Sequence, residues 1–490
     1  MATPRRRPGD DRPRRQTPVG FQPGAFPGSL CWPDESWRWG RARPTGRLGS
    51  LVLRTVRTAP PTKRSTALSS FTAEAAAALA GPEWLRDRRV AAAERFATAH
   101  LPSPEEEVWR YSRIADLDLA AWTPARGAPA PTAPAVDDVL RGAAVTVTVL
   151  DGVASISEIP SDWLAKGVVI ATAPTLADAA ASGLGAVAAD GPDVFATLND
   201  AFALDPIVIS VPRGVRLHAP ILVTNHLATA GTAVFPRLVV RLGEGAEAVV
   251  VDHVSSGVGP VLSVPLTELD VARGARLGYL HIQELGQNAW QIGSLVARID
   301  QEADLKAGLV GLGGEYARIR TDCTLAGRGS NGDLLAAYFG EGHQTLDFRT
   351  FQHHDAPDTT SNLLFKGAVG GHSRSVYTGL IRVDKEARGT NAFQTNRNVK
   401  LSDTAWAESV PNLEIETNDV HCSHASTVGP VDAEQRFYLE SRGVAPKMAD
   451  RLIVAGFFDE VVRALPAAGA IAAVRDRITA KLDRTAGDLR

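Results

Sequence analysis

Cysteine is scarce in this chain, which has only Cys31, Cys323 and Cys422 among its 490 residues. Three cysteines exclude a disulfide-stabilised scaffold and cannot supply the four thiolates of a usual iron–sulfur site. No apolar run reaches about 18 residues, so we expect neither a transmembrane helix nor stable membrane association. The formal net charge of −3 argues against a strongly basic nucleic-acid-binding protein.

Several catalytic motifs are missing as well. The chain has no Gly-x-x-x-x-Gly-Lys-Ser/Thr loop, no His-Glu-x-x-His, no Cys-x-x-Cys and no Gly-x-Ser-x-Gly. Gly311-Leu312-Gly313-Gly314 resembles part of a dinucleotide-binding fingerprint, but Tyr316 stands where the third glycine belongs. We therefore expect a protein that does not bind and hydrolyse ATP by a phosphate-loop mechanism.

The first segment, residues 1–62, is rich in arginine and proline and has little to bury. Such a composition predicts a disordered extension, either a dispensable tail or an arm for targeting or anion binding. No apolar stretch follows the arginines, which argues against a secretory signal and favours a cytoplasmic protein.

Two other segments have helical patterns. Residues 63–140 are predicted to be an N-terminal helical region followed by a Pro/Ala linker. Within it, Ser103 and Glu106 have the spacing of a capping box and predict a helix through Tyr111. Residues 430–490 are predicted to be a C-terminal helical domain, because apolar residues recur there at helical spacing.

Residues 141–429 have the pattern of a mainly β core. Short β-branched runs such as Val145–Leu150 alternate with turns, and small turns recur at Ala246, Ala275, Ala303 and Ser330, which are 29, 28 and 27 positions apart. Ala387 follows 57 positions later, about two more periods. A period near 28 fits one coil of a β-solenoid with three short strands. Coincidental turns in an open β-sandwich are the alternative.

Four histidines come close together in this region, at His343, His353, His354 and His372. Imidazoles on neighbouring coils suit a metal site, but exposed or hydrogen-bonded histidines on a solenoid face are the favoured explanation. Cys323 is isolated in a strand-like stretch and is interpreted as a core residue.

Cys422 has histidines on both sides, in the run His421-Cys422-Ser423-His424. Nearby imidazoles can lower the pKa of a thiol. If the run is extended, Cys422 and His424 lie on one face and offer two ligands to a soft metal, with the remaining ligands from another subunit. The alternative is a small buried cysteine that closes the last coil.

Two stretches around this run resemble the SufB/SufD family of iron–sulfur cluster assembly scaffolds. They are Pro411–Ile415 with Asp419–Ala425, and Phe437–Val444; Glu107–Tyr111 is also similar to the N-terminal region of the family. The run from Cys422 to Gly429, Cys-Ser-His-Ala-Ser-Thr-Val-Gly, is similar to SufD, whereas SufB proteins typically have Cys-Glu-His-Glu-Ala there. The usual SufD pattern has Gly-Ala after the histidine, where this chain has Ala425-Ser426.

The resemblance implies a right-handed parallel β-helix flanked by helical regions. It further implies a non-catalytic scaffold subunit, not an enzyme. It implies a SufB-like paralogue as the partner of the β-helix and a SufC-type ABC ATPase as the partner of the C-terminal helices. It places His424, with Cys422 beside it, at a site where a nascent cluster forms transiently, and no cofactor is held permanently. For the ATPase contact it indicates Phe437, Tyr438, Ser441, Arg442 and Gly443. The residues carry no signal for or against a flavin.

Three other functions are compatible with these residues. One is a SufB-like scaffold that works as a homodimer. Another is a β-helix enzyme acting on polysaccharides, a class that is mostly secreted. The last is a structural adaptor that stabilises its partners without touching iron.

Overall fold

The computed structural model describes residues 70–127, 142–189 and 191–485. The predicted arginine- and proline-rich extension, residues 1–62, lies outside the described residues, and Cys31 with it. Residues 128–136 of the predicted linker lie outside them as well.

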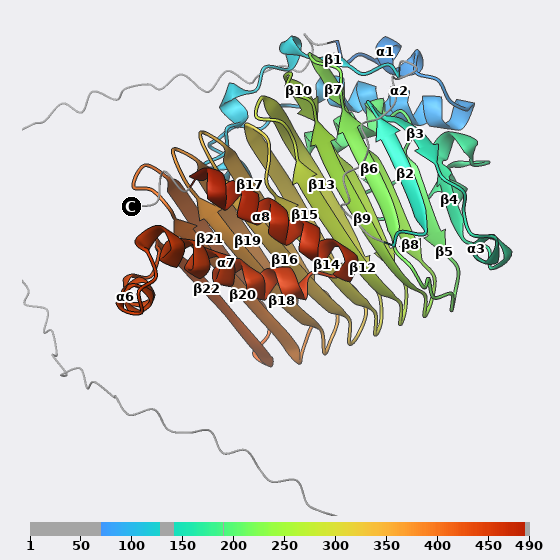
Figure 1. Cartoon of the computed structure of the whole chain (residues 1–490). Helices are drawn as coiled ribbons and strands as arrows, with labels where there is room; N and C mark the ends of the chain where they lie inside the picture. Colours follow the sequence, from blue (N-terminus) through green and yellow to red (C-terminus); the bar gives the residue numbers. More distant parts are fainter. Residues whose placement is uncertain (1–69, 128–141, 190, 486–490) are drawn as a thin grey trace, which may run out of the picture. The chain divides into compact units, whose positions relative to one another are not determined.

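Two sheets stack against each other as a β-solenoid of about eight coils (Figure 1). The first sheet contains, in spatial order, β21 (Trp406–Ile415), β19 (Arg374–Val383), β17 (Thr345–His354), β15 (Tyr316–Leu325), β13 (Ala289–Ile299), β11 (Leu266–Val271), β8 (Arg237–Leu242), β5 (Ile207–Val211) and β4 (Val169–Thr172). The second contains β22 (Val420–Pro430), β20 (Thr390–Lys400), β18 (Thr360–Val369), β16 (Asn331–Gly340), β14 (Asp304–Gly311), β12 (Arg276–Glu284), β9 (Glu247–Ser256), β6 (Ile221–Leu227), β2 (Val145–Leu150) and β3 (Val153–Ile156). The predicted mainly β solenoid with helices before and after it is confirmed.

The predicted period is also confirmed, but the number of strands in a coil is not. Arg276 pairs with Glu247 in one neighbouring coil and with Asp304 in the other, 29 and 28 residues away. The later coils consist of two long strands, one in each sheet, instead of three short ones. A short extra strand exists only in early coils, as β1 (Thr123–Pro124), β7 (Thr232–Val234) and β10 (Val261–Ser263).

Proline explains this difference between early and later coils. Pro265 separates β10 from β11, yet both pair with the single continuous strand β13. Proline has no N–H for the ladder and therefore interrupts a strand. Gly293 and Ile319 stand at the equivalent position in the next two coils, and there the strand runs on without a break.

Left-handed residues form one corner of the solenoid. Gly245, Gly274 and Glu302 have φ angles of 65°, 64° and 54°, and each donates its N–H to a carbonyl of the following coil. The small residue after each corner points inward and is fully buried, as the repeat predicted for Ala246, Ala275 and Ala303. The assignment of Ala387 to this series is wrong. Thr390 is the equivalent residue, because Asn391 pairs with Thr360 in the ladder.

Changing the corner residues should alter stability in opposite directions. A Cβ added to Gly274 meets no atom within 4 Å, so Gly274→Ala adds only the strain of the left-handed conformation. We expect it to lower the free energy of unfolding by about 1 kcal/mol, and Glu302→Gly to raise it by up to about 1 kcal/mol. Urea unfolding of both variants measures this, and destabilisation by both would contradict the proposed cause.

Helices before and between the strands cover the outer face of the first sheet. They are α1 (Ala73–Ala77), α2 (Glu83–Thr98), α4 (Ala179–Ser182) and α5 (Val194–Phe202). α3 (Ser161–Ala165) instead lies at the end of the stack, where its Trp163 belongs to the core of the solenoid (Figure 1). Short 3₁₀ turns lie at Glu107–Trp109, Ile114–Asp116, Leu119–Ala121 and Ala173–Thr175. Phe71, Phe202 and Phe235 pack together where α1 and α5 meet the solenoid.

The helix predicted from Ser103 to Tyr111 is wrong. Only half of the capping box forms, with the Ser103 N–H donating to the Glu106 carboxylate at 2.9 Å. Residues 103–113 instead form an irregular strap across the first sheet, with one 3₁₀ turn at Glu107–Trp109. Its Val108 carbonyl accepts a hydrogen bond from Arg318 at 2.9 Å, and its Arg110 carbonyl accepts one from Arg349 at 2.6 Å. Both arginines are buried, so they need these carbonyls, which an α-helix would occupy internally.

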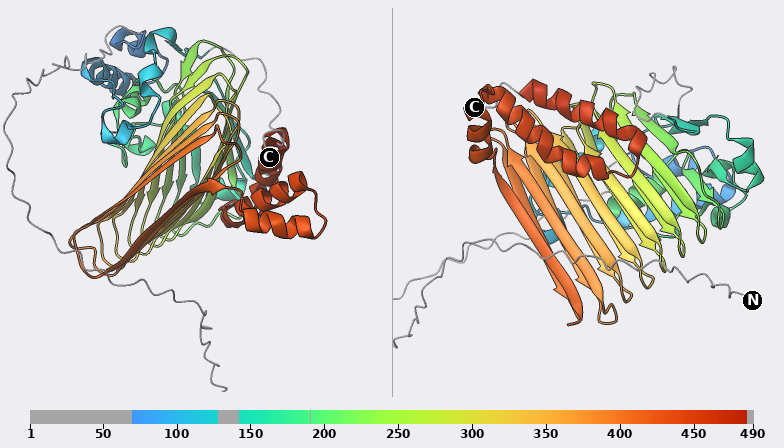
Figure 2. Two further views of the ribbon diagram at one scale, coloured as in Figure 1. Left: turned by 90° about the vertical axis from the view of Figure 1, so that its left-hand side faces the viewer. Right: turned by 60° about the horizontal axis from the view of Figure 1, so that its bottom comes forward.

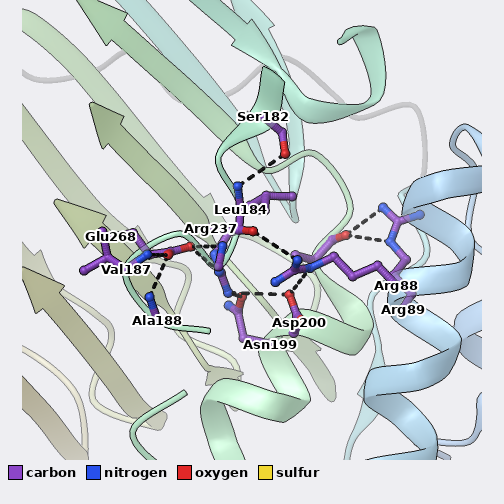
Figure 3. Close-up of polar contacts among 12 residues, drawn as sticks. Arg88, Arg89, Ser182, Leu184, Val187, Ala188, Asn199, Asp200, Arg237 and Glu268 are labelled. Carbon is purple, nitrogen blue, oxygen red and sulfur yellow. Dashed lines mark hydrogen bonds and ion pairs between the residues drawn. The ribbon is translucent and has the colours of Figure 1, made fainter. Parts of the chain in front are cut away.

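A buried ion pair anchors the segment between α4 and α5 on the first sheet (Figure 3). The guanidinium of Arg237 on β8 meets the carboxylate of Glu268 on β11, and both side chains are almost completely buried. The same carboxylate accepts backbone N–H bonds from Gly185, Val187 and Ala188 at 2.8, 3.0 and 2.9 Å. Glu268 thus has a partner on every side, as a buried charge requires.

Two C-terminal helices cover the outer face of the second sheet. They are α7 (Pro446–Ala464) and α8 (Ile471–Thr485), joined by a 3₁₀ turn at Ala468–Ala470. α6 (Ala433–Ser441) precedes them and projects at the end of the stack (Figure 1). Phe458 of α7 stacks on Phe339 of β16, and Val474 and Ile478 of α8 belong to the same apolar cluster. These helices and the second sheet are visible together in Figure 1.

Candidate functional site

The last coil ends in two strands that are each paired on one side only. β21 pairs with β19, and β22 pairs with β20. Among the described residues, no strand covers the other edge of either one. In the left view of Figure 2 both strands face the viewer at this end of the stack. An exposed strand edge offers unpaired N–H and C=O groups to another chain.

His424 and Cys422 both lie on β22, and both point toward the interior of the coil. Cys422 pairs with Ala392 and His424 with Gln394, two inward residues of β20 that are 0% and 1% exposed. Cys422 contacts the apolar cluster formed by residues such as Ile381. The two side chains therefore share one face of the strand, as the alternation predicts. His424 is nevertheless exposed, because no described residue lies above the last coil.

The surroundings of Cys422 within this chain do not lower the pKa of its thiol. Burial raises the pKa of Cys422, and a hydrogen bond with the backbone of Ala392 offsets only part of this rise. His421 cannot help, because it lies on the opposite face of β22. A thiol with a raised pKa stays protonated at neutral pH and is a weak metal ligand. Cys422 thus has the surroundings of a packing residue, and Cys323, which is fully buried, matches its predicted place in the core.

Two polar residues near His424 were not identified from the sequence. Gln394 lies directly below His424 in the ladder, and its buried amide oxygen has no hydrogen-bond partner among the described residues. Ser409 lies on the inward face of β21, and its buried hydroxyl also has no hydrogen-bond partner among the described residues. The solenoid period was the available signal for Gln394, which precedes His424 by one coil of 30 residues.

The open end therefore provides an incomplete metal site. It has one exposed imidazole and one half-buried, protonated thiol. Within the described ranges, no group of three or more His, Cys, Asp or Glu side chains is arranged to hold a metal ion. A single imidazole at an open strand edge binds a metal usefully only when a second chain adds ligands.

The residues predicted for ATPase contact lie on or just after α6. Phe437 and Tyr438 are 72% and 58% exposed, and none of the residues of α6 is buried. Ser441 donates to the Tyr438 carbonyl at 2.7 Å, Arg442 lies over the Tyr438 ring, and Gly443 with φ 84° follows the helix end. A hollow of about 800 Å³ separates α6 from α7. Neighbouring exposed aromatic rings of this kind are typical of a protein–protein contact.

The four clustered histidines separate into two places. His343 and His372 stack on neighbouring corners, with ring centroids 5.0 Å apart. His354 is fully buried at the opposite end of β17, between Thr359 and Ser361, and burial lowers its pKa to about 4. A single metal site for all four is thus wrong.

The glycine run that resembles part of a dinucleotide-binding fingerprint forms a corner between two strands. A Cβ on Gly313 would lie 2.2 Å from the Leu285 carbonyl oxygen, so glycine is needed there for close packing of the backbone.

Several known proteins are similar to this chain in sequence. A family model described as "SUF system FeS cluster assembly, SufBD core domain" matches residues 225–457. An iron–sulfur cluster assembly SufBD family protein of Mycobacterium tuberculosis is 36% identical over 285 residues, which are 56% of this chain and 70% of the relative. The iron–sulfur cluster assembly protein SufD of Escherichia coli is 31% identical over 296 residues, 59% of this chain and 70% of the relative.

A plant protein is a more distant relative. The chloroplastic protein ABCI7 of Arabidopsis thaliana is 28% identical over 287 residues, 56% of this chain and 60% of the relative. The fold and the site together define a β-solenoid protein with a half-built ligand site at one open end. The chain belongs to the SufBD family of iron–sulfur cluster assembly proteins. None of the described helices is both long and apolar enough to cross a membrane.

Proposed function

We propose that this chain is the SufD-like, non-catalytic subunit of a complex with a SufB-like paralogue and a SufC-type ATPase. The observation that carries the proposal is the open last coil, where an exposed His424 stands beside an unpaired strand edge. The likeness to SufD of Escherichia coli supports the choice of subunit. No cofactor is held permanently, and the nascent cluster is the substrate of the complex.

Pairing of strand edges is the proposed contact with the SufB-like chain. β22 is 11 residues long and pairs with β20 on one side only, so its other edge can add a strand of the partner. Pairing at this edge would bring ligands of the partner close to His424. A neutral imidazole binds iron less tightly than a thiolate does, which suits a site that must release its cluster.

The C-terminal helices give the ATPase a mechanical route to this site. β22 ends at Pro430 and α6 begins at Ala433, so a movement of α6 acts directly on the strand that carries His424. α7 is held on the second sheet by Lys366 of β18, which donates to the Phe457 carbonyl at 2.8 Å and pairs with Glu460. Closure of the ATPase on ATP would move α6 and open the paired edges, which admits iron and sulfide.

Co-purification tests the proposal. The chain, carrying an affinity tag, is expressed with the SufB-like and SufC-like chains of the same organism, and the mass of the purified assembly is measured. We expect an assembly that contains all three chains. A lone monomer or a homodimer that receives sulfur itself would contradict the SufD-like role.

Paired variants locate the two contacts. Phe437→Ser with Tyr438→Ser removes the exposed aromatic rings and should release the ATPase while the SufB-like chain stays bound. Leu164→Ser with Val258→Ser is the matched control, because these side chains are 54% and 87% exposed and lie outside α6 and the last coil. Retention of the ATPase by the aromatic variant would place its contact elsewhere.

A further inference from the structure

A pocket of about 790 Å³ lies on the corner side of the last coils, apart from the open end with His424. The stacked imidazoles of His343 and His372 line it together with Arg113. Three carboxylates, those of Asp116, Glu315 and Asp403, are also in the lining. Arg374, Lys400 and the ring of Trp406 line it as well. Its volume is in the usual range of small-molecule sites, but its lining is much more polar than usual, which indicates a charged ligand.

The two imidazoles are held in place by their corners. Gly342 and Gly371 have φ angles of 59° and 62°, and the His372 N–H donates to the Gly342 carbonyl at 2.8 Å. A Cβ on Gly371 would lie 3.2 Å from the Gly342 backbone, so glycine lets the corners stack closely. The rings of His343 and His372 are within 7° of parallel, with centroids 5.0 Å apart, so the two imidazoles lie side by side on the wall of the pocket.

The charges in the pocket are distributed unevenly. Arg113 donates to Asp116 at 3.0 Å and to Glu315 at 2.9 Å, so its single positive charge is shared between these two carboxylates. Lys400 makes no ion pair within the described part of the chain, and Arg374 contacts the Trp406 ring without a carboxylate partner there. Cationic donors thus remain available on the side of the imidazoles.

This arrangement suits an anion better than a metal ion. A zinc-like ion needs nitrogen ligands at about 2.0–2.1 Å. Rings stacked face to face with centroids 5.0 Å apart cannot both approach one ion so closely. Two neighbouring imidazoles with an arginine and a lysine offer several N–H donors for the separate oxygens of a phosphate group. The neighbouring Trp406 ring offers a stacking surface for an attached aromatic ring.

We propose that this pocket binds the phosphate group of a small phosphorylated molecule. His343, His372, Arg374 and Lys400 hold the phosphate, and Trp406 contacts the rest of the ligand. The site is independent of cluster assembly at His424, so its failure would leave the proposed function unaffected.

Calorimetric titration of the full-length chain at low salt tests the site with inorganic phosphate, pyrophosphate and ATP without magnesium. We expect saturable binding at one site, weakened at least about tenfold in the double variant His343→Ala/Arg374→Ala. The matched control is Lys385→Ala/Arg388→Ala, which removes two exposed cations from the opposite corner and should bind as the wild type does. Circular dichroism melting confirms that both variants are folded.

The outcomes are distinct. Equal affinity for inorganic phosphate and ATP supports the site and identifies free phosphate as the ligand. A preference for ATP that Trp406→Leu abolishes supports it and identifies a nucleotide. The proposal is overturned by absence of saturable binding to all three probes, by unchanged binding in the pocket variant, or by equal weakening in the control.

Discussion

Replacing His424 by alanine is expected to lower the rate of cluster formation on the assembled complex by at least about tenfold. The reason is that His424 is the exposed imidazole at the open end, while Cys422 is half-buried and protonated. Removing a residue that merely hydrogen-bonds to a metal ligand typically lowers metal affinity or activity 10- to 100-fold. Removing the ligand itself should lower it at least as much. Visible absorbance of the cluster during anaerobic reconstitution measures the rate.

His421→Ala is the matched control for this experiment. His421 lies three residues earlier on the same strand, but it is on the opposite face and is also exposed. We expect its variant to form clusters at the wild-type rate. The mass of both variant complexes must equal that of the wild type. If His424→Ala prevented assembly of the complex, the residue would be structural, and equal rates for both variants would remove His424 from the site.

Replacing Glu268 by glutamine should destabilise the chain by about 3–5 kcal/mol, the usual cost of breaking a buried ion pair from one side. The variant leaves the buried Arg237 without a counter-charge. The amide NH₂ group of the glutamine would also replace one of the two carboxylate oxygens. It would then face either the Gly185 N–H or the N–H groups of Val187 and Ala188, donor against donor. The midpoint of urea unfolding at pH 7 measures the effect.

Glu247→Gln is the control, since Glu247 pairs with Arg216 and Arg276 on an exposed corner. Exposed pairs contribute roughly 0–1 kcal/mol, so its variant should unfold close to the wild type. A loss at Glu268 no larger than at Glu247 would show that the buried pair does not anchor the fold.

The effect of Glu268 should depend on pH. Burial opposes ionisation, but Arg237 and the three backbone N–H groups lower the pKa of Glu268 below its ordinary value of 4.5 in the folded chain. A lowered pKa stabilises the folded state above the unfolded pKa, and this contribution is lost as the pH falls through the folded value. The stability difference between wild type and Glu268→Gln should therefore be constant from pH 7 to about 5.5 and shrink on further acidification. A difference that grew toward acid would contradict this assignment.

The solenoid could be predicted because its signals are local and repeat. The corners near Ala246, Ala275 and Ala303 need small residues in each coil, and the sequence shows this at a regular spacing. The two long strands in each coil were missed, since their turns are not marked by glycine alone. The place of Thr390 was missed because the later coils are longer, with Arg374 and Trp406 32 residues apart.

Long-range partners explain the remaining errors. The strap near Val108 has a good helix-start pattern, but the buried Arg318 and Arg349, more than 200 positions away, take its carbonyls. The pair Arg237 and Glu268 depends on a loop from another part of the chain and leaves no local pattern. His424 was found through family resemblance, while the spacing alone left Cys422 equally prominent.

The two ends of the solenoid differ in a way that bears on the size of its assemblies. The far end is closed by β3 and β4, which are four residues long and pair antiparallel with β2 and β5. The long parallel strands β21 and β22 leave only the other end open for stacking. A solenoid with unpaired strand edges at both ends would polymerise head to tail into fibres. A solenoid with unpaired edges at one end only can pair with one other solenoid and then has no edge left for a third. If the proposed pairing of strand edges holds, the short antiparallel strands at the far end would limit the assembly to two solenoids.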